Sequence, residues 1–182
     1  FIEEDGELYM IPETSNNREV ALYQAENFPF DWKKKHVLLN DIDAADVTIT
    51  KWDSKYWMFC VTRDGAGRYS DCLSLFHADS LFGPWQPHTQ NPVMIDRATA
   101  RPAGNMVQLD GKLWRPVQDC SLSYGAEQAL CEVTRLDESG FEQVVHKKLG
   151  PSEAWPGRKL HSLNRAGQLE VVDGAVLRPK WQ

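Results

Sequence analysis

Hydrophobic and polar residues alternate along short stretches of this chain, with the two-residue period of a β-strand that is buried on one face. Clear examples are Val-Thr-Ile-Thr-Lys-Trp at residues 47–52 and Leu-Ser-Leu-Phe at residues 73–76. Turn-forming Gly, Asp and Asn residues separate such stretches. No segment has the sustained helical period and the capping residues of an amphipathic helix. The pattern therefore predicts an all-β fold.

A turn followed by an aromatic strand recurs along the chain. It reads Asp-Gly-Glu-Leu-Tyr-Met-Ile at 5–11, Asp-Ser-Lys-Tyr-Trp-Met-Phe at 53–59 and Asp-Gly-Lys-Leu-Trp-Arg-Pro at 110–116, with a weaker copy at 166–172. The second residue of the turn moves from 6 to 54, 111 and 167, which gives steps of 48, 57 and 56 positions. A repeat of about 50 residues with about four strands is typical of a β-propeller blade.

The repeat predicts a five-bladed β-propeller, of which this chain holds about three and a half blades. The whole chain is then one propeller domain or a fragment of one. The expected blades cover residues 1–42, 43–97, 98–150 and 158–182. Because propellers close with roughly four to eight blades, we expect at least one further blade before Phe1. A four-bladed ring that closes by pairing the two ends of the chain is the alternative.

Four of the seven tryptophans recur at equivalent blade positions. Trp32 and Trp85 come late in their blades, and Trp57 and Trp114 lie on the second strand. Residues that repeat in this way usually pack between blades, so we expect packing roles for these four. Trp155 does not repeat, and we expect it to form a surface platform.

The composition fits a compact protein with a sizeable core. The chain has 182 residues, of which 42% are hydrophobic and 25% are charged. Its net charge of −6 and its pI near 5.4 argue against non-specific nucleic-acid binding and against a basic membrane-binding surface. No stretch approaches the roughly 18 apolar residues of a membrane span. We expect a soluble protein, for which the cytoplasm is the preferred location.

The cysteines fit no metal-binding pattern. Cys60 and Cys72 are 12 positions apart, and Cys120 and Cys131 are 11 apart. Four buried thiols are the preferred interpretation. Two disulfides across neighbouring strands are the alternative in a secreted protein. The five histidines are scattered along the chain, so we expect no metal and no cofactor.

Polar residues gather where one face of the propeller is expected. The first strand of a blade begins on the same face as the loop between its second and third strands, and three successive first strands begin near Asp46, Arg101 and His161. The loops expected on this face, which are rich in Asn, Asp, Arg, Glu and Tyr, span residues 12–18, 62–69 and 118–125. We therefore predict a shallow polar funnel that binds a sugar or another polyol. For single residues, capping of a turn is the alternative.

The candidate ligand-binding residues come from these strand starts and loops. They are Asn16, Asn17, Arg101, Arg115, Gln118, Tyr124 and His161. Arg115 and Pro116 interrupt an otherwise apolar strand. An Arg on an inner strand needs a partner, so we expect Arg115 to face Asp119 or an anionic group of the ligand.

Several segments resemble known carbohydrate-active propellers. Residues 46–59, Asp-Val-Thr-Ile-Thr-Lys-Trp-Asp-Ser-Lys-Tyr-Trp-Met-Phe, resemble a blade opening of five-bladed glycoside hydrolases of family 43 and the related family 32. A more specific resemblance is to the propeller at the N-terminus of glucosamine inositolphosphorylceramide transferases and their bacterial homologues. It is carried by residues 9–29, 83–93, 100–125 and 160–174. This resemblance implies a five-bladed domain.

The resemblance to family 43 implies three acids on successive blades, which act as general base, pKa modulator and general acid. Asp46 matches the modulator, and the base would precede Phe1. The position of the general acid holds Arg101-Pro102, and an Arg cannot donate a proton at neutral pH. Hydrolysis needs two carboxyl groups that flank the scissile bond. Asp119 and Glu13 are therefore the remaining catalytic candidates beside Asp46.

These observations predict a carbohydrate-binding propeller domain of a glycan-assembly or glycan-processing protein. Its expected partners are a neutral or anionic carbohydrate and the other domains of the parent chain, with no nucleic acid and no membrane span. Arg101 at the floor of the funnel suits a phosphate or carboxylate group on the glycan. A glycoside hydrolase with an altered acid pair is the first alternative. A protein-interaction propeller is the second, because one fold serves many functions.

Overall fold

The computed structural model describes residues 1–63, 69–152 and 157–176. In these residues the structure is built of antiparallel β-strands, and its helical element is the short 3₁₀ helix η1 (Ser15–Asn17). No helix among them is long and apolar enough to cross a membrane. The described part of the chain thus confirms the predicted all-β fold. Trp155 and residues 64–68 of the expected funnel loop lie outside the described residues.

The strands form three consecutive sheets and a hairpin. The first sheet contains β1 (Ile2–Glu4), β2 (Glu7–Met10), β3 (Glu19–Asn27) and β4 (Asp31–Asn40). The second sheet contains β5 (Ala44–Trp52), β6 (Lys55–Thr62), β7 (Cys72–Ala78), β8 (Gln86–Pro87) and β9 (Met94–Ile95). The third sheet contains β10 (Arg101–Pro102), β11 (Val107–Leu109), β12 (Lys112–Asp119), β13 (Glu127–Asp137) and β14 (Gly140–Leu149). The hairpin consists of β15 (Lys159–Ala166) and β16 (Leu169–Ala175).

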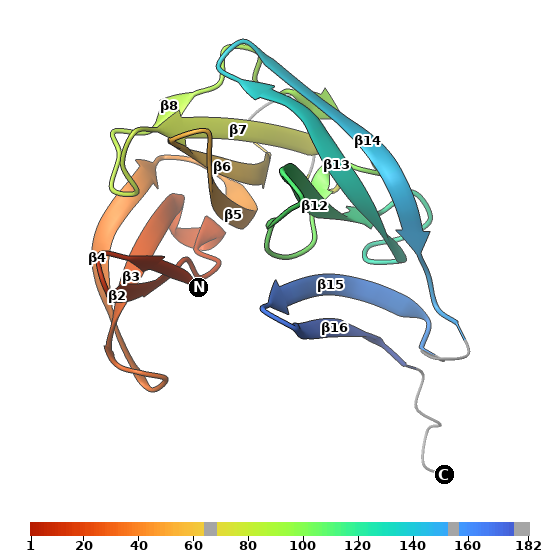
Figure 1. The fold of residues 1–182 in the computed structure, drawn as a ribbon, viewed down its shortest axis with the longest axis horizontal. Coiled ribbons are helices and arrows are strands. Elements are labelled where there is room, and N and C mark those ends of the chain that lie inside the picture. Colours follow the sequence, from red (N-terminus) through yellow and green to blue (C-terminus); the bar gives the residue numbers. More distant parts are fainter. Residues whose placement is uncertain (64–68, 153–156, 177–182) are drawn as a thin grey trace.

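The sheets follow one another around a common centre (Figure 1). In each sheet the chain starts near that centre and moves outward, so that β5 and β15 lie inside while β4 and β14 lie at the periphery. This is the arrangement of successive blades in a β-propeller. The described residues therefore form a partial propeller, as the repeat predicts.

The recurring turn of the sequence is a tight two-residue hairpin turn. It occurs at Asp5-Gly6, Asp53-Ser54 and Asp110-Gly111, and the strand residues on either side of each turn pair directly. Both central residues have positive φ, with 52° and 79° in the first turn and 53° and 73° in the third. This backbone matches the type I′ turn, which follows the natural twist of the two strands and which Asp-Gly adopts readily. The same local geometry thus begins three blades.

β6 is buried because it lies between two interfaces. Met58 belongs to a core cluster with Leu22 of the first sheet, whereas Phe59 belongs to a cluster with Leu113 of the third sheet. Successive side chains of a strand point to opposite faces, so an unbroken apolar run is expected for a central blade that packs on both sides.

The four repeating tryptophans differ in burial. Trp57 and Trp85 are buried, with 2% and 8% of their surface exposed, which confirms their predicted packing role. Trp32 and Trp114 are only partly buried. Trp32 stacks on Phe1 with ring centroids 5.5 Å apart, and Trp114 lines a groove between the third sheet and the hairpin. Trp32 therefore packs within the first sheet, and Trp114 contacts the His146 ring of its own sheet, instead of being buried between blades.

The cysteines are four free, buried thiols. This agrees with the preferred interpretation of the sequence and excludes the two disulfides. Burial raises the pKa of the Cys60 thiol well above its usual range, because a thiolate would lose its hydration there. The thiols therefore act as small apolar residues of the core.

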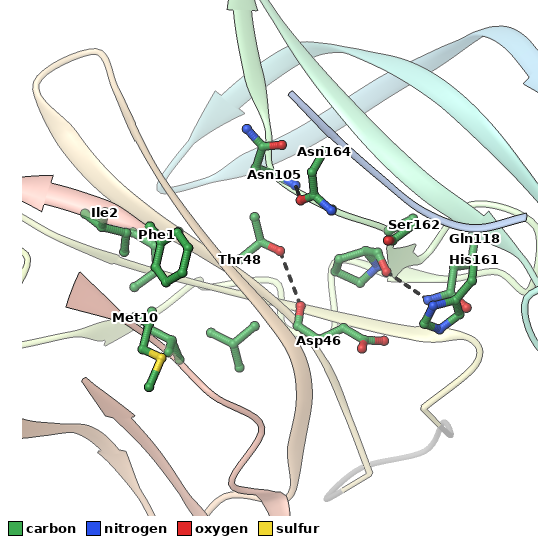
Figure 2. A pocket seen from close by; sticks show the side chains of 16 residues that line it. Phe1, Ile2, Met10, Asp46, Thr48, Asn105, Gln118, His161, Ser162 and Asn164 are labelled. Atoms are coloured by element: carbon green, nitrogen blue, oxygen red, sulfur yellow. Dashed lines mark hydrogen bonds between the residues drawn. The ribbon is translucent and has the colours of Figure 1, made fainter. Parts of the chain in front are cut away.

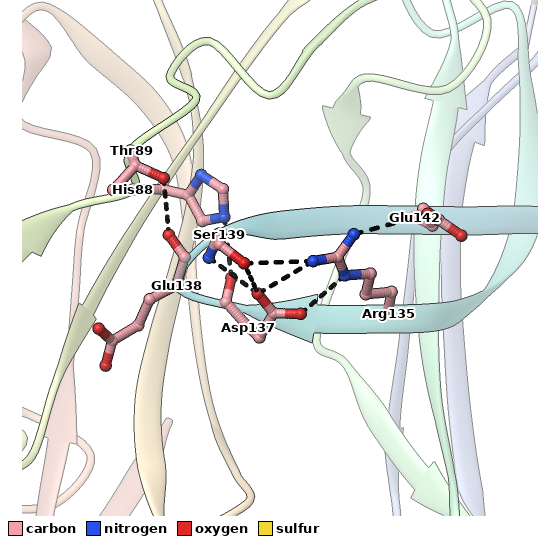
Figure 3. A network of polar contacts seen from close by, with 7 residues as sticks. All are labelled: His88, Thr89, Arg135, Asp137, Glu138, Ser139 and Glu142. Atoms are coloured by element: carbon pink, nitrogen blue, oxygen red, sulfur yellow. Dashed lines mark hydrogen bonds and ion pairs between the residues drawn. The ribbon is translucent and has the colours of Figure 1, made fainter.

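The turn between β13 and β14 fastens the third sheet to the second (Figure 3). His88, directly after β8, donates from Nε2 to the carbonyl oxygen of Asp137 over 2.9 Å. Its Nδ1 accepts the backbone N–H of Gln90 over 3.1 Å, which places the imidazole proton on Nε2. Thr89 Oγ1 donates to the carbonyl oxygen of Glu138 over 2.8 Å. We call these contacts the interblade latch.

Candidate functional site

A cavity of about 260 Å³ lies where the inner strands converge, and we call it the axial pocket (Figure 2). Its walls come from β1, β2, β5, the segment after β10, and β15. Its polar lining residues are Asp46, Thr48, Asn105, Gln118, His161, Ser162 and Asn164. Its apolar lining residues are Phe1, Ile2, Met10, Ile11, Val47, Ile49, Pro102 and Ala103. The pocket therefore combines hydrogen-bonding groups with apolar surface.

A bulge in β5 carries Asp46 into the pocket wall. The pairing between β5 and β6 shifts between Ala45 and Thr48, so one extra residue is inserted in β5. Asp46 lies in this bulge with a φ of 52°, a left-handed conformation that Asp adopts more readily than most residues. Its backbone N–H donates to Oε2 of Glu13 over 3.2 Å. The bulge thus changes the direction of the Asp46 side chain relative to the regular part of β5.

Asp46 and Arg101 form an ion pair between the second and third sheets. Asp46 Oδ2 lies 2.5 Å from Arg101 Nε. The N–H is not aligned as a hydrogen bond, so these two buried atoms have no hydrogen-bond partner in the described structure. Burial raises the pKa of Asp46 above its usual value, although the neighbouring Arg101 opposes that rise. The charge of the carboxylate is therefore balanced by Arg101.

A chain of polar contacts continues from Arg101 to the hairpin. The Arg101 Cζ atom lies 4.6 Å from the centroid of the Tyr124 ring, a cation–π distance. The Tyr124 hydroxyl lies 2.5 Å from His161 Nε2, and His161 Nδ1 lies 3.1 Å from Asp173 Oδ2. Side chains from β5, β10, the loop after β12, β15 and β16 thus meet at one end of the axial pocket.

The hairpin is held against the third sheet by its backbone. The Leu163 N–H donates to the carbonyl oxygen of Ala103 over 2.7 Å. The Asn105 side chain accepts the N–H of Arg165 over 2.8 Å and donates to its carbonyl oxygen over 2.9 Å. Gly104 has a φ of 134°, and a Cβ there would lie 1.9 Å from the Leu163 carbonyl oxygen. This close approach, which requires glycine, brings the pocket residues of β15 into place.

The structure brings together five of the ten predicted site residues at the axial pocket. Asp46, Gln118 and His161 line it, and Arg101 and Tyr124 contact those lining residues. Glu13, which is exposed, lies at the rim of the axial pocket, where it accepts a hydrogen bond from the backbone N–H of Asp46. Asn16 and Asn17 lie in the exposed helix η1 and do not line the pocket in the described structure.

Arg115 points away from the axial pocket. Successive side chains of β12 alternate between the two faces, so Arg115 lies opposite the face that carries Gln118. Its guanidinium donates to the carbonyl oxygens of Thr99 and Ala100, the former over 2.8 Å, and to Gln143 Oε1 over 2.9 Å. Burial lowers its pKa to about 10. The expectation that Arg115 pairs with Asp119 or a ligand anion is wrong, because backbone carbonyls and an amide hold it.

Asp119 lies on the same face of β12 as Arg115. Its Oδ2 accepts from Lys148 Nζ over 2.9 Å, and its Oδ1 accepts the backbone N–H of Ser121 over 3.0 Å. Burial raises its pKa, but the hydrogen bonds from Ser121 and Lys148 outweigh burial and the net shift is downward. The geometry therefore separates Asp119 from Asp46 and from the axial pocket.

The sequence did not reveal several polar residues of this site, among them Asn105, Asn164 and Asp173. Asn105 follows Gly104 in the segment 100–125, and a Gly-Asn pair on an inner strand is a usable signal for a close backbone approach. Asn164 and Asp173 lie on the hairpin. No spacing pattern points to them, because they join the site only when β15 docks against the third sheet.

Solved structures of glycoside hydrolases share this fold. An exo-β-1,3-galactanase of Clostridium thermocellum aligns with a TM-score of 0.61 at 13% identity, over 79% of this chain and 32% of the galactanase. A family 43 protein of Bacillus licheniformis aligns with a TM-score of 0.58 at 21% identity, over 82% of this chain and 32% of that protein. These matches confirm the propeller class of the fold.

Sequence comparison identifies closer relatives. The chain is 30% identical over 184 aligned positions to "Glucosamine inositolphosphorylceramide transferase 1" of Oryza sativa and 32% identical over 183 to the Arabidopsis thaliana protein of the same name. Each match covers 93% of this chain and 24% of the relative, so the chain spans about a quarter of their length. Residues 1–175 also match the family described as "Glucosamine inositolphosphorylceramide transferase 1, N-terminal". The chain therefore belongs to the family formed by the N-terminal region of these glycan-related transferases.

Proposed function

We propose that this chain binds one uncharged sugar unit in the axial pocket and serves as the glycan-binding domain of a glycan-processing protein. The observation that carries this proposal is Asp46, a carboxylate that lines the pocket and stays 27% exposed while its Oδ2 is paired with Arg101. A sugar hydroxyl supplies a suitable donor, because it can bond to the carboxylate without adding a charge.

The other lining residues support a sugar as the ligand. The side-chain amides of Gln118 and Asn164 contain both donors and acceptors, which match the dual character of hydroxyl groups, whereas the Asn105 amide is used by the backbone of Arg165. Met10 and Pro102 add apolar surface for the C–H groups of a sugar ring. A few polar groups set in apolar surface are typical of small-molecule sites.

The charge balance of the pocket favours an uncharged ligand over an anionic one. Arg101 already contacts Asp46, so an anion would have to compete with a carboxylate 2.5 Å away. Arg115 faces the opposite side of β12 and is held by backbone carbonyls. We therefore prefer a neutral glycan to the anionic one that Arg101 alone would suit.

A role within a larger protein follows from the family. The related transferases are about four times as long as the region that this chain matches, since the match covers 24% of each. We propose that the domain holds a glycan close to the part of such a protein that performs the transfer. The binding step would then belong to this chain and the chemistry to another region.

Calorimetric titration of the whole protein with the uncharged sugars glucose, galactose, mannose, xylose and N-acetylglucosamine tests this proposal. We expect Asp46→Asn to weaken binding of the recognised sugar by about tenfold, the usual effect of losing a charged acceptor. Asp119→Asn is the matched control, because Asp119 is also a buried, ion-paired carboxylate but lies outside the pocket. Absence of binding to every sugar, or equal weakening by both variants, would contradict the proposal.

Glycoside hydrolysis is the second candidate function. It is favoured by the contact between Glu13 Oε2 and the backbone N–H of Asp46, which brings two carboxylic acids to one rim of the pocket. It ranks second because Asp46 is the one carboxylic acid among the described lining residues and Arg101 engages it. Nitrophenyl glycosides test it: turnover that is lost in both Asp46→Asn and Glu13→Gln would establish hydrolysis, and no turnover in the unmodified protein would exclude it for these substrates.

A further inference from the structure

Tyr124 is an aromatic residue held in an exposed position at the edge of the axial pocket. It lies in the loop between β12 and β13, and 48% of its surface is exposed. An exposed aromatic ring on a loop is usually held by few contacts and can change its orientation, yet contacts on several sides hold this ring in place.

Three polar contacts fix Tyr124. Its hydroxyl lies 2.5 Å from His161 Nε2, its carbonyl oxygen accepts from Lys159 Nζ over 2.6 Å, and the Arg101 guanidinium lies over one face of its ring. The next residue, Gly125, has a φ of 62°, and a Cβ there would lie 3.3 Å from the His161 ring. The loop is therefore fitted closely against β15, and the Tyr124 ring has a defined orientation.

These contacts join Tyr124 to the pocket rather than to the core. His161 lines the pocket, and Arg101 contacts Asp46, which also lines it. Phe1 also lines the pocket, but its ring packs on Phe28 and Trp32 of the first sheet. Arg101 covers one face of the Tyr124 ring and the His161 ring lies 5.2 Å from it, and 48% of the residue remains exposed.

We propose that the exposed face of Tyr124 is a second sugar subsite, so that the ligand class is an oligosaccharide with one unit in the axial pocket and the adjoining unit stacked on Tyr124. This inference rests on the proposed function and adds the length of the ligand to it. The face of an aromatic ring carries partial negative charge and attracts the C–H groups on the apolar side of a sugar ring. A ring that is already immobile loses little further freedom when the sugar stacks on it.

His161 and Asp173 act as positioning residues in this arrangement. Asp173 accepts from His161 Nδ1–H, which leaves Nε2 as the acceptor for the Tyr124 hydroxyl. The hydroxyl is thereby used within the protein. The ring, and not the hydroxyl, is the part of Tyr124 that is offered to the ligand.

Calorimetric titration of the whole protein with glucose, galactose, mannose and xylose, and with their β-linked disaccharides and trisaccharides, tests the subsite. We expect the recognised disaccharide to bind more tightly than its monosaccharide, and Tyr124→Ala to remove this gain of about three- to tenfold. Tyr124→Phe retains the ring but loses the hydroxyl contact with His161, so it should retain most of the gain. Phe30→Ala, which removes an aromatic residue that is 81% exposed on the β3–β4 turn, is the matched control and should change nothing.

The outcomes separate the subsite from the pocket. If Tyr124→Ala weakens the monosaccharide and the disaccharide equally, Tyr124 only supports the pocket and the subsite is wrong while the proposed function stands. If Tyr124→Ala changes neither affinity, or if the disaccharide gains nothing over the monosaccharide, the subsite is likewise wrong. If no saccharide binds the unmodified protein, the proposed function and the subsite both fail.

Discussion

Arg101 Nε lies 2.5 Å from Asp46 Oδ2, across the boundary between the second and third sheets. Arg101 begins the inner strand of the third sheet, at the position where the resemblance to family 43 hydrolases places a general acid. A cation there cannot protonate a leaving group. It instead neutralises the acid on the preceding sheet. Under the proposed function, this exchange of a proton donor for a charge partner favours binding of a sugar over its cleavage.

Removal of the Asp46 charge should destabilise the fold as well as weaken binding. Asp46→Asn leaves Arg101, which is only 8% exposed, as a buried cation without its counter-ion. We expect the free energy of unfolding to fall by less than about 1 kcal/mol, because the burial that raises the pKa of Asp46 offsets the ion pair and 27% of the Asp46 side chain is exposed. Urea denaturation at neutral pH measures this change.

The double variant Asp46→Asn/Arg101→Gln serves as the control for the single variant Asp46→Asn. It removes both charges, so it should be more stable than Asp46→Asn alone. A double variant whose loss equals the sum of the two single losses would contradict the ion pair.

Asp119→Asn should change stability in a pH-dependent way. The pKa of Asp119 is lowered in the folded protein: burial raises it, but the hydrogen bonds from Ser121 and Lys148 prevail. A carboxylate of this kind stabilises the fold above its unfolded pKa of about 4, and the contribution disappears as the pH falls through the folded pKa. We expect a loss of about 1 kcal/mol at pH ~7 that shrinks toward pH ~3, measured by urea denaturation. A loss of equal size at both pH values would show that the charge of Asp119 is not involved.

The sequence predicted the elements that depend on local chemistry. The turn at Asp5-Gly6 and its copy at Asp110-Gly111 were recognisable because a type I′ turn demands residues that tolerate positive φ. The alternating pattern of residues 47–52 likewise predicted the strand β5. Asp46, Gln118 and His161 could be placed near the pocket because each lies at an inner-strand start or at the funnel end of a second strand.

The sequence did not predict which face a side chain would occupy within a strand. Arg115 and Gln118 lie three positions apart on β12, and this odd spacing puts them on opposite faces. A shift of one residue in the inferred register exchanges the two faces, so Arg115 and Asp119 were assigned to a pocket that they do not line. Contacts between distant segments, such as Asn105 with Arg165, depend on docking of whole strands and leave no local pattern.

Gly104→Ala should disturb both stability and the pocket. A Cβ at this position would lie 1.9 Å from the Leu163 carbonyl oxygen, and the φ of 134° is unfavourable for alanine. The hairpin must then move away from the third sheet, and with it the pocket residues of β15. We expect a loss of about 3 kcal/mol or more in denaturant unfolding, together with weaker sugar binding.

Gly111→Ala is the control for Gly104→Ala. Gly111 also has a positive φ, 73°, but no heavy atom lies within 4 Å of its added Cβ. The loss of stability in Gly111→Ala should therefore reflect backbone strain alone, about 1 kcal/mol, and sugar binding should remain unchanged. Equal effects of the two substitutions would show that the close approach to Leu163 is unimportant.

The interblade latch should carry a measurable part of the stability between the second and third sheets. His88→Leu removes the donor to the Asp137 carbonyl oxygen and the acceptor for the Gln90 N–H, and His88 is only 2% exposed. Groups left without partners in a buried site lower stability by about 2–3 kcal/mol. Thr89→Ala removes a single exposed hydrogen bond to the Glu138 carbonyl oxygen and should lower it by less than about 1 kcal/mol. Denaturation followed by tryptophan fluorescence measures both losses, and a Thr89→Ala loss as large as that of His88→Leu would contradict the assigned role of the imidazole.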